Sequence, residues 1–166
     1  MKFTTLLSPE NIRQGMVYSS KKTMFEAIGR IVEKQVILDD FSSLQCFSSL
    51  FNREKLGCTG LGNGVAMPRA KLPIGDKPIA IFLQLSEPLD YEAIDKRYVD
   101  LVFAVLIPEN MCSQYVAILE ELSQRLTEKN LCKQLRAAQS ADEIWQIFEF
   151  ADQNYGEQIE LPIEQD

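Results

Sequence analysis

Apolar residues recur at helical spacing in two stretches of the first third of the chain. Between positions 24 and 32 they fall at i, i+3, i+4, i+7 and i+8, which predicts an amphipathic helix over 21–35. A second stripe predicts a helix over 40–54, with Asp39 or Asp40 as a suitable N-cap. The run 15–19, just before the first helix, is typical of a short strand.

Two long apolar runs lie in the middle of the chain, at 79–85 and 99–107. Uninterrupted runs of this kind are typical of central strands that are covered on both faces. A shorter strand is expected at 64–68. The sheet formed by these strands therefore needs helices on both sides.

The chain is expected to be helical from about residue 112 onward. Apolar side chains within Tyr115–Leu126 form one stripe, and Thr127 caps a shorter helix. Ser140 and Glu143 form a capping box that opens the last helix. The order is strand, two helices, three strands, three helices, and it predicts a three-layer α/β/α domain.

Acidic residues are concentrated at the end of the sequence. The chain carries 17 Lys plus Arg and 24 Asp plus Glu, a formal net charge of −7. Residues 149–166 hold six of the acids and no basic residue, so the rest is nearly neutral. We therefore expect a domain at 1–150 and an acidic tail at 151–166 that frays or is disordered. This charge disfavours nucleic acid as a partner.

The remaining composition indicates a cytoplasmic protein. No apolar run approaches the roughly 18 residues of a membrane span, which argues against membrane insertion. The first residues show no signal-peptide pattern. None of the four cysteines forms a C-x-x-C pair, so we expect free thiols in a reducing compartment.

The sequence contains no histidine. This absence excludes histidine-based acid/base catalysis, the Ser-His-Asp triad and every histidine-ligated metal site. It also excludes any reaction that passes through phosphohistidine. No cluster has the spacing of a metal site, and we expect no cofactor.

The densest signal is the segment 57–64, which reads GCTGLGNG and holds four of the eight glycines. A P-loop would continue as Gly-Lys-Ser/Thr, whereas here Gly62 is followed by Asn63 and Gly64. A dinucleotide-binding loop follows a strand and opens a helix, whereas this segment follows a helix and opens a strand. These departures disfavour nucleotide binding.

Basic residues flank the glycine-rich segment. Arg53, Lys55, Arg69 and Lys71 are opposed within 53–72 only by Glu54. Backbone N–H groups and guanidinium groups in such a loop can hold an anion, especially phosphate. A tight turn surrounded by solvated charges has the same composition, so the residues alone leave both interpretations open.

Residues 53–72, from Arg53-Glu-Lys-Leu-Gly-Cys-Thr-Gly to Met-Pro-Arg-Ala-Lys-Leu72, resemble a known signature. It is that of the type-2 enzyme IIA domains of the bacterial phosphotransferase system, nitrogen-regulatory branch, approximately R-E-x-x-G-S-T-G-I-G-N-G-[IV]-A-[IV]-P-H-G-K. The stretches 20–22, 93–95, 99–101 and 135–140 extend the resemblance. It implies a mixed sheet between helical layers.

In that family the histidine after the proline accepts a phosphoryl group from an HPr-like carrier. The matching residue here is Arg69, and the following glycine is Ala70. The stretch 114–117, where the family usually has a second histidine, has none. Arg53 matches the family's active-site arginine. Because a guanidinium group stays protonated and offers no lone pair, Arg69 cannot take over the transfer.

Three hypotheses follow from the resemblance. The favoured one is a regulatory module that cannot be phosphorylated on histidine, and that binds proteins such as an HPr-like carrier or regulatory targets. A second is a residual phosphocarrier that uses Cys58, with Arg53, Lys55 and Arg69 favouring its thiolate. A third is a sensor of phosphate or phosphorylated metabolites through Arg53 and Arg69.

All three hypotheses place the site in one region, and only the second makes the protein an enzyme. The expected binding pocket consists of Arg53, Gly57, Cys58, Thr59, Gly60, Gly62, Asn63, Gly64, Arg69 and Tyr115.

Overall fold

The computed structural model describes residues 1–35, 41–73 and 75–164, with side chains as far as Tyr155. Its described part contains one six-stranded mixed sheet in the order β1-β5-β6-β3-β2, with β4 paired to β6. The strands are β1 (Ile12–Met16), β2 (Gly60–Gly62), β3 (Val65–Ala66), β4 (Arg69–Leu72), β5 (Ile79–Leu89) and β6 (Val99–Pro108). The two long apolar runs thus form β5 and β6, as predicted.

The antiparallel pair β5–β6 is the centre of the sheet, with Phe82 opposite Phe103. On the side away from β5, β6 pairs in parallel with two short strands in succession. Val65 of β3 lies opposite Leu101, and Arg69 of β4 lies opposite Val105. Residues 65–72 therefore follow β6 almost from one end to the other.

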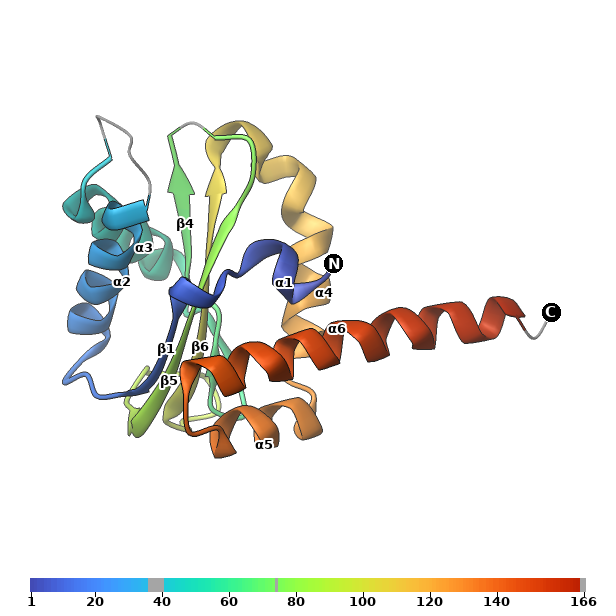
Figure 1. The fold of residues 1–166 in the computed structure, drawn as a ribbon. Helices are drawn as coiled ribbons and strands as arrows, with labels where there is room; N and C mark the ends of the chain where they lie inside the picture. Colours follow the sequence, from blue (N-terminus) through green and yellow to red (C-terminus); the bar gives the residue numbers. More distant parts are fainter. Residues whose placement is uncertain (36–40, 74, 165–166) are drawn as a thin grey trace.

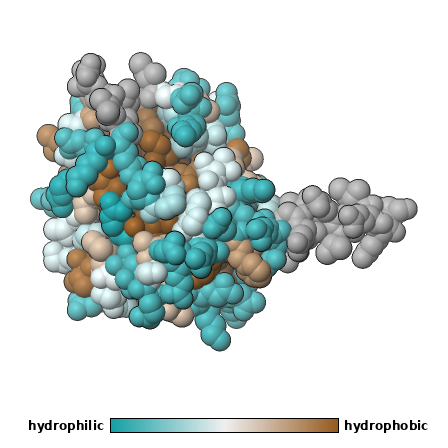
Figure 2. Space-filling view, viewed as in Figure 1, coloured by the Kyte–Doolittle hydropathy of each residue, from teal (hydrophilic) through white to brown (hydrophobic). Residues whose placement is uncertain are grey.

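Helices cover both faces of the sheet (Figure 1). One face carries α2 (Lys21–Gln35) and α3 (Ser43–Leu56), which pack on a core that includes Phe25 and Tyr91. The other carries α1 (Phe3–Leu6), α4 (Val116–Leu126), α5 (Lys129–Ala137) and α6 (Ala141–Glu164). On the face shown in Figure 2 apolar residues appear in patches between hydrophilic ones. The three-layer prediction is confirmed.

Two hydrophobic cores, one on each face of the sheet, hold these layers together. On the α4–α6 side four phenylalanine rings meet with centroids 4.9 to 6.5 Å apart, in the range where edge-to-face contacts are favourable. These rings are Phe3, Phe82, Phe103 and Phe148.

No helix in the described residues is long and apolar enough to cross a membrane.

Several predicted boundaries are wrong. The first strand covers 12–16 rather than 15–19, and five strands rather than three separate the two groups of helices. The sequence pattern also missed α1 and the two 3-10 helices, η1 (Pro9–Asn11) and η2 (Glu109–Tyr115). These pieces are too short to show a helical or strand period.

The predicted helix caps also need correction. Ser42 caps α3 in a full capping box with Gln45, whereas Asp39 and Asp40 lie outside the described residues. Glu128, not Thr127, caps α5, because its carboxylate accepts from two backbone N–H groups. Ser140 accepts from the backbone of Glu143 as predicted, but the Glu143 carboxylate accepts from the N–H of Gln139.

The acidic segment 149–166 does not begin as a disordered tail. Helix α6 passes residue 150 without a break and projects from the body of the protein (Figure 1). Asp152 is only 4% exposed and accepts hydrogen bonds from the N–H groups of Phe3 and Thr4 at 2.8 and 2.9 Å. Arg125 pairs with the same carboxylate at 3.3 Å. Asp152 thus joins α6 to α1 and α4.

We predict that Asp152→Ala lowers the free energy of unfolding by about 3 kcal/mol, because it removes the acceptor of the Phe3 and Thr4 N–H groups and the carboxylate that pairs with Arg125. Urea unfolding measures the change. Glu149→Ala, an exposed acid on the same helix, is the matched control and should stay within about 0.5 kcal/mol of wild type. Equal effects of the two substitutions would contradict a structural role for Asp152.

Candidate functional site

The glycine-rich segment begins where α3 ends. Gly57 is the C-cap residue, and its N–H donates to the carbonyl of Glu54. The chain then forms the antiparallel β2–β3 hairpin, with Gly60 opposite Ala66. Its turn contains three consecutive residues with positive φ, namely Gly62 at 91°, Asn63 at 58° and Gly64 at 82°. Such a turn favours glycine and asparagine, which explains the composition of the segment.

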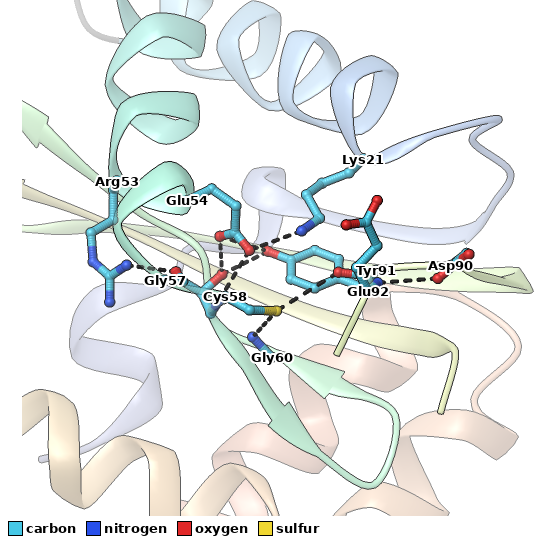
Figure 3. Close-up of polar contacts among 10 residues, drawn as sticks. Lys21, Arg53, Glu54, Gly57, Cys58, Gly60, Asp90, Tyr91 and Glu92 are labelled. Carbon is cyan, nitrogen blue, oxygen red and sulfur yellow. Dashed lines mark hydrogen bonds and ion pairs between the residues drawn. The ribbon is translucent and has the colours of Figure 1, made fainter. Parts of the chain in front are cut away.

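A buried polar network holds the start of the hairpin (Figure 3). The Glu54 carboxylate accepts from Lys21 Nζ at 3.0 Å, from the backbone N–H of Thr59 at 3.0 Å and from the Thr59 hydroxyl at 2.6 Å. The Thr59 hydroxyl has one proton, which it donates to Glu54. It therefore accepts a hydrogen bond from the Tyr91 hydroxyl, at 2.7 Å. Burial and the nearby Glu54 charge raise the pKa of Tyr91, which therefore stays a neutral donor.

A second set of contacts holds the tip of the hairpin at Asn63. Asp95 accepts from its backbone N–H at 3.0 Å, Arg97 donates to its side-chain oxygen at 3.1 Å, and Arg136 donates to its carbonyl at 2.6 Å. Two backbone N–H groups, those of Asn63 and Arg97, lower the pKa of Asp95. Arg136 Nε also donates to the two carboxylate oxygens of Asp100, at 2.9 and 3.0 Å. The tip of the hairpin is thus fixed from the loop between β5 and β6 and from α5.

On the free side of β4 lies a cleft of about 640 Å³ between α3 and α4. Arg53, Arg69 and Lys71 line it, and no acid is among its lining residues in the described part of the chain. We call this feature the β4-edge cleft; it is lined by Gln45, Ser48, Ser49, Asn52, Arg53, Leu56, Arg69, Ala70, Lys71, Ile107, Cys112, Val116 and Leu119.

Arg69 is a partly buried cation of the cleft. Its Nε is buried and has no hydrogen-bond partner among the described residues. Burial lowers the pKa of Arg69, the charge of Arg53 lowers it further, and Glu54 opposes the shift. The guanidinium nevertheless remains charged at neutral pH, because its ordinary pKa lies above 12. The cleft therefore presents positive charge that is not ion-paired with any carboxylate in the part of the chain that the structure describes.

The structure brings together only part of the predicted pocket. Arg53 and Arg69 line the β4-edge cleft, whereas the 57–64 segment forms the hairpin beside it. The Cys58 thiol points under the hairpin, where it donates to the Tyr91 carbonyl at 3.7 Å and accepts from the N–H of Gly60 at 3.4 Å. Tyr115 packs against the core under α4.

Sequence reasoning missed one wall of the cleft. Six α3 residues that line it recur at i, i+3, i+4, i+7, i+8 and i+11: Gln45, Ser48, Ser49, Asn52, Arg53 and Leu56. Five of these six residues are polar, and together with Leu56 they mark a single helix face opposite the apolar stripe, a pattern that was visible in the sequence. Ser49 also accepts from the backbone N–H of Lys71 at 2.8 Å, which ties α3 to the edge of β4.

We predict that Gly64→Ala lowers the free energy of unfolding by at least about 2 kcal/mol, since a Cβ there would lie 2.6 Å from Arg136 and 3.0 Å from Asp100, at a φ of +82°. Gly57→Ala is the control, because its Cβ would meet nothing within 4 Å. The free energy of unfolding of Gly57→Ala should match that of wild type or exceed it by less than about 1 kcal/mol. Thermal and urea unfolding compare the two, and equal losses would contradict this account of the turn.

Comparison with known proteins identifies the family. Residues 5–151 match the family described as phosphoenolpyruvate-dependent sugar phosphotransferase system, EIIA 2. The nitrogen regulatory protein homolog of Haemophilus influenzae is 57% identical over 156 residues, which cover 93% of this chain and 94% of that protein. The nitrogen regulatory protein of Escherichia coli is 36% identical over 148 residues, 89% of each chain.

Solved structures agree. The crystal structure of nitrogen regulatory protein IIA-Ntr from Neisseria meningitidis matches with a TM-score of 0.78 at 33% identity, covering 87% of this chain and 97% of that one. A complex of enzyme IIA-mannitol with phosphorylated enzyme IIB-mannitol from Escherichia coli contains the same fold, with a TM-score of 0.68 at 20% identity over 87% and 99% of the two chains. The chain therefore belongs to the type-2 enzyme IIA family of the phosphotransferase system, as a homologue of its nitrogen regulatory proteins.

Proposed function

We propose that this protein is a cytoplasmic regulator of the nitrogen-regulatory IIA type that binds partner proteins and is not phosphorylated on histidine. The observation that carries the proposal is the chemistry of Arg69. It directly follows Pro68, where the family signature has the acceptor histidine, and its side chain lines the β4-edge cleft. A guanidinium has five donors and no lone pair with which to attack phosphorus.

The rest of the chain supports the same conclusion. No histidine exists anywhere in the sequence, so no neighbouring imidazole replaces the missing acceptor. The alternative acceptor, Cys58, receives no support from the geometry. Its thiol is half-buried, lies beneath the hairpin and is absent from the lining of the cleft that holds Arg53 and Arg69.

Protein binding is supported by the rim of the cleft. Leu56 on α3 and Val116 on α4 flank it and are 84% and 66% exposed. Exposed apolar side chains grouped around a cationic cleft are typical of protein-recognition surfaces. The IIA-mannitol enzyme, which shares the fold, is solved in complex with a protein partner, phosphorylated IIB-mannitol. An HPr-like carrier and regulatory targets are the partner classes that we propose here.

We predict that the wild-type protein gains no phosphoryl group when it is incubated with a phosphorylated HPr-like carrier, as read by intact mass. Arg69→His should become phosphorylated, since the cleft would then contain a nucleophile. Arg97→His is the control: it introduces the same imidazole outside the cleft and should stay unmodified. Stoichiometric phosphorylation of the wild type would refute the proposal.

We also predict that Val116→Asp reduces capture of native partners from a cell extract by at least about tenfold, because it places a charge on the apolar rim. Ile94→Asp is the matched control, since Ile94 is 91% exposed and is not among the residues lining the cleft. Quantitative mass spectrometry of the captured proteins compares the two. If both variants capture partners like wild type, the rim is not the docking surface.

A further inference from the structure

We infer that the β4-edge cleft binds a small organic phosphate. Its phosphate group would lie against Arg53 and Arg69, and its apolar body would lie on the floor formed by Ile107 and Leu119. The inference deepens the proposed function and rests on it in one respect: a cleft without an acceptor nucleophile can hold a phosphate without transferring it.

The charges of the residues that line the cleft favour binding of an anion. The protein as a whole is acidic, with a net charge of −7, whereas this cleft has three cations and no acid among its described lining residues. Glu54, which acts electrostatically on Arg69, is already hydrogen-bonded by Lys21 and Thr59. Local potentials of this kind raise the concentration of the opposite charge.

Arg69 lacks the partner that such an anion would supply. Its Nε is a buried donor without an acceptor in the described residues, and buried donors of this kind normally have one. The repulsion by Arg53 and the burial that lower its pKa would both be offset by an anion between the two guanidinium groups. A phosphate suits this arrangement better than a carboxylate, because it has a further acceptor oxygen and a second charge.

The size and lining of the cleft indicate a small molecule with an apolar part. Its volume of about 640 Å³ falls in the usual range of ligand sites, roughly 300–1,000 Å³. Ile107 and Leu119 are 4% and 8% exposed and form a floor deep below the rim. Gln45 and Asn52 supply amide groups on the α3 wall. Inorganic phosphate alone would leave the apolar floor unused.

Isothermal titration calorimetry with phenyl phosphate tests the inference on the purified full-length chain. We expect phenyl phosphate to bind at least about tenfold more tightly than inorganic phosphate at the same ionic strength, and phenol not to bind. Arg69→Met and Arg53→Met should each weaken phenyl phosphate binding at least about tenfold, because each removes charge-assisted hydrogen bonds. Arg69→Lys keeps the charge but not the planar fork, and should weaken binding by a smaller factor.

Arg30→Met is the matched control, since Arg30 is an exposed arginine on α2 that does not line the cleft. This variant should bind phenyl phosphate with the affinity of wild type. The inference is overturned if phenyl phosphate does not bind at millimolar concentration, if inorganic phosphate binds equally well, or if Arg69→Met binds like wild type. Tighter binding of a phosphoserine peptide than of phenyl phosphate would assign the cleft to a protein-borne phosphate instead. None of these outcomes changes the phosphorylation or partner-capture results, so the two proposals fail separately.

Discussion

The position of Arg69 depends on the parallel pairing of residues 65–72 with β6. Along this segment the odd positions Val65 and Met67 join the core under α4, and the even positions Ala66, Ala70 and Leu72 join the core under α2 and α3. Pro68 joins β3 to β4, and its carbonyl accepts from the N–H of Val105 at 2.9 Å, which keeps the register across the join. A slip of one residue would exchange the two faces and bury Arg69 among apolar side chains, so core packing fixes the site.

The sequence was sufficient for the parts of the fold that depend on local periodicity. The helix over 21–35 and the strands within 79–85 and 99–107 follow from patterns that repeat over several residues. The short strands β2, β3 and β4 do not, because two to four residues are too few to show a period. Their existence depends on the partner strand β6, which lies more than 25 residues further along the chain in the case of β4.

The candidate site was predictable to a similar extent. Arg53 and Arg69, which flank the glycine-rich segment, both line the β4-edge cleft, whereas Cys58 and Tyr115 are not among its lining residues. Side-chain direction decides such cases, and it depends on contacts between distant positions. Cys58 faces Tyr91, and the Glu54 network joins Lys21, Thr59 and Tyr91 from three separate elements. These contacts have no local signature.

The placement of Arg69 beside Arg53 in the cleft lowers the free energy of unfolding, and the packing around the cleft compensates for this loss. Arg69 is half-buried beside Arg53, and its Nε has no hydrogen-bond partner among the described residues. Local packing alone would not select this arrangement. The protein partner of the rim and the small phosphate on the floor would share this one cleft. Any effect of one on the affinity of the other must then be reciprocal, because coupling between two binding equilibria is symmetric. A ligand of the floor would thus change the affinity for the protein partner without a covalent step.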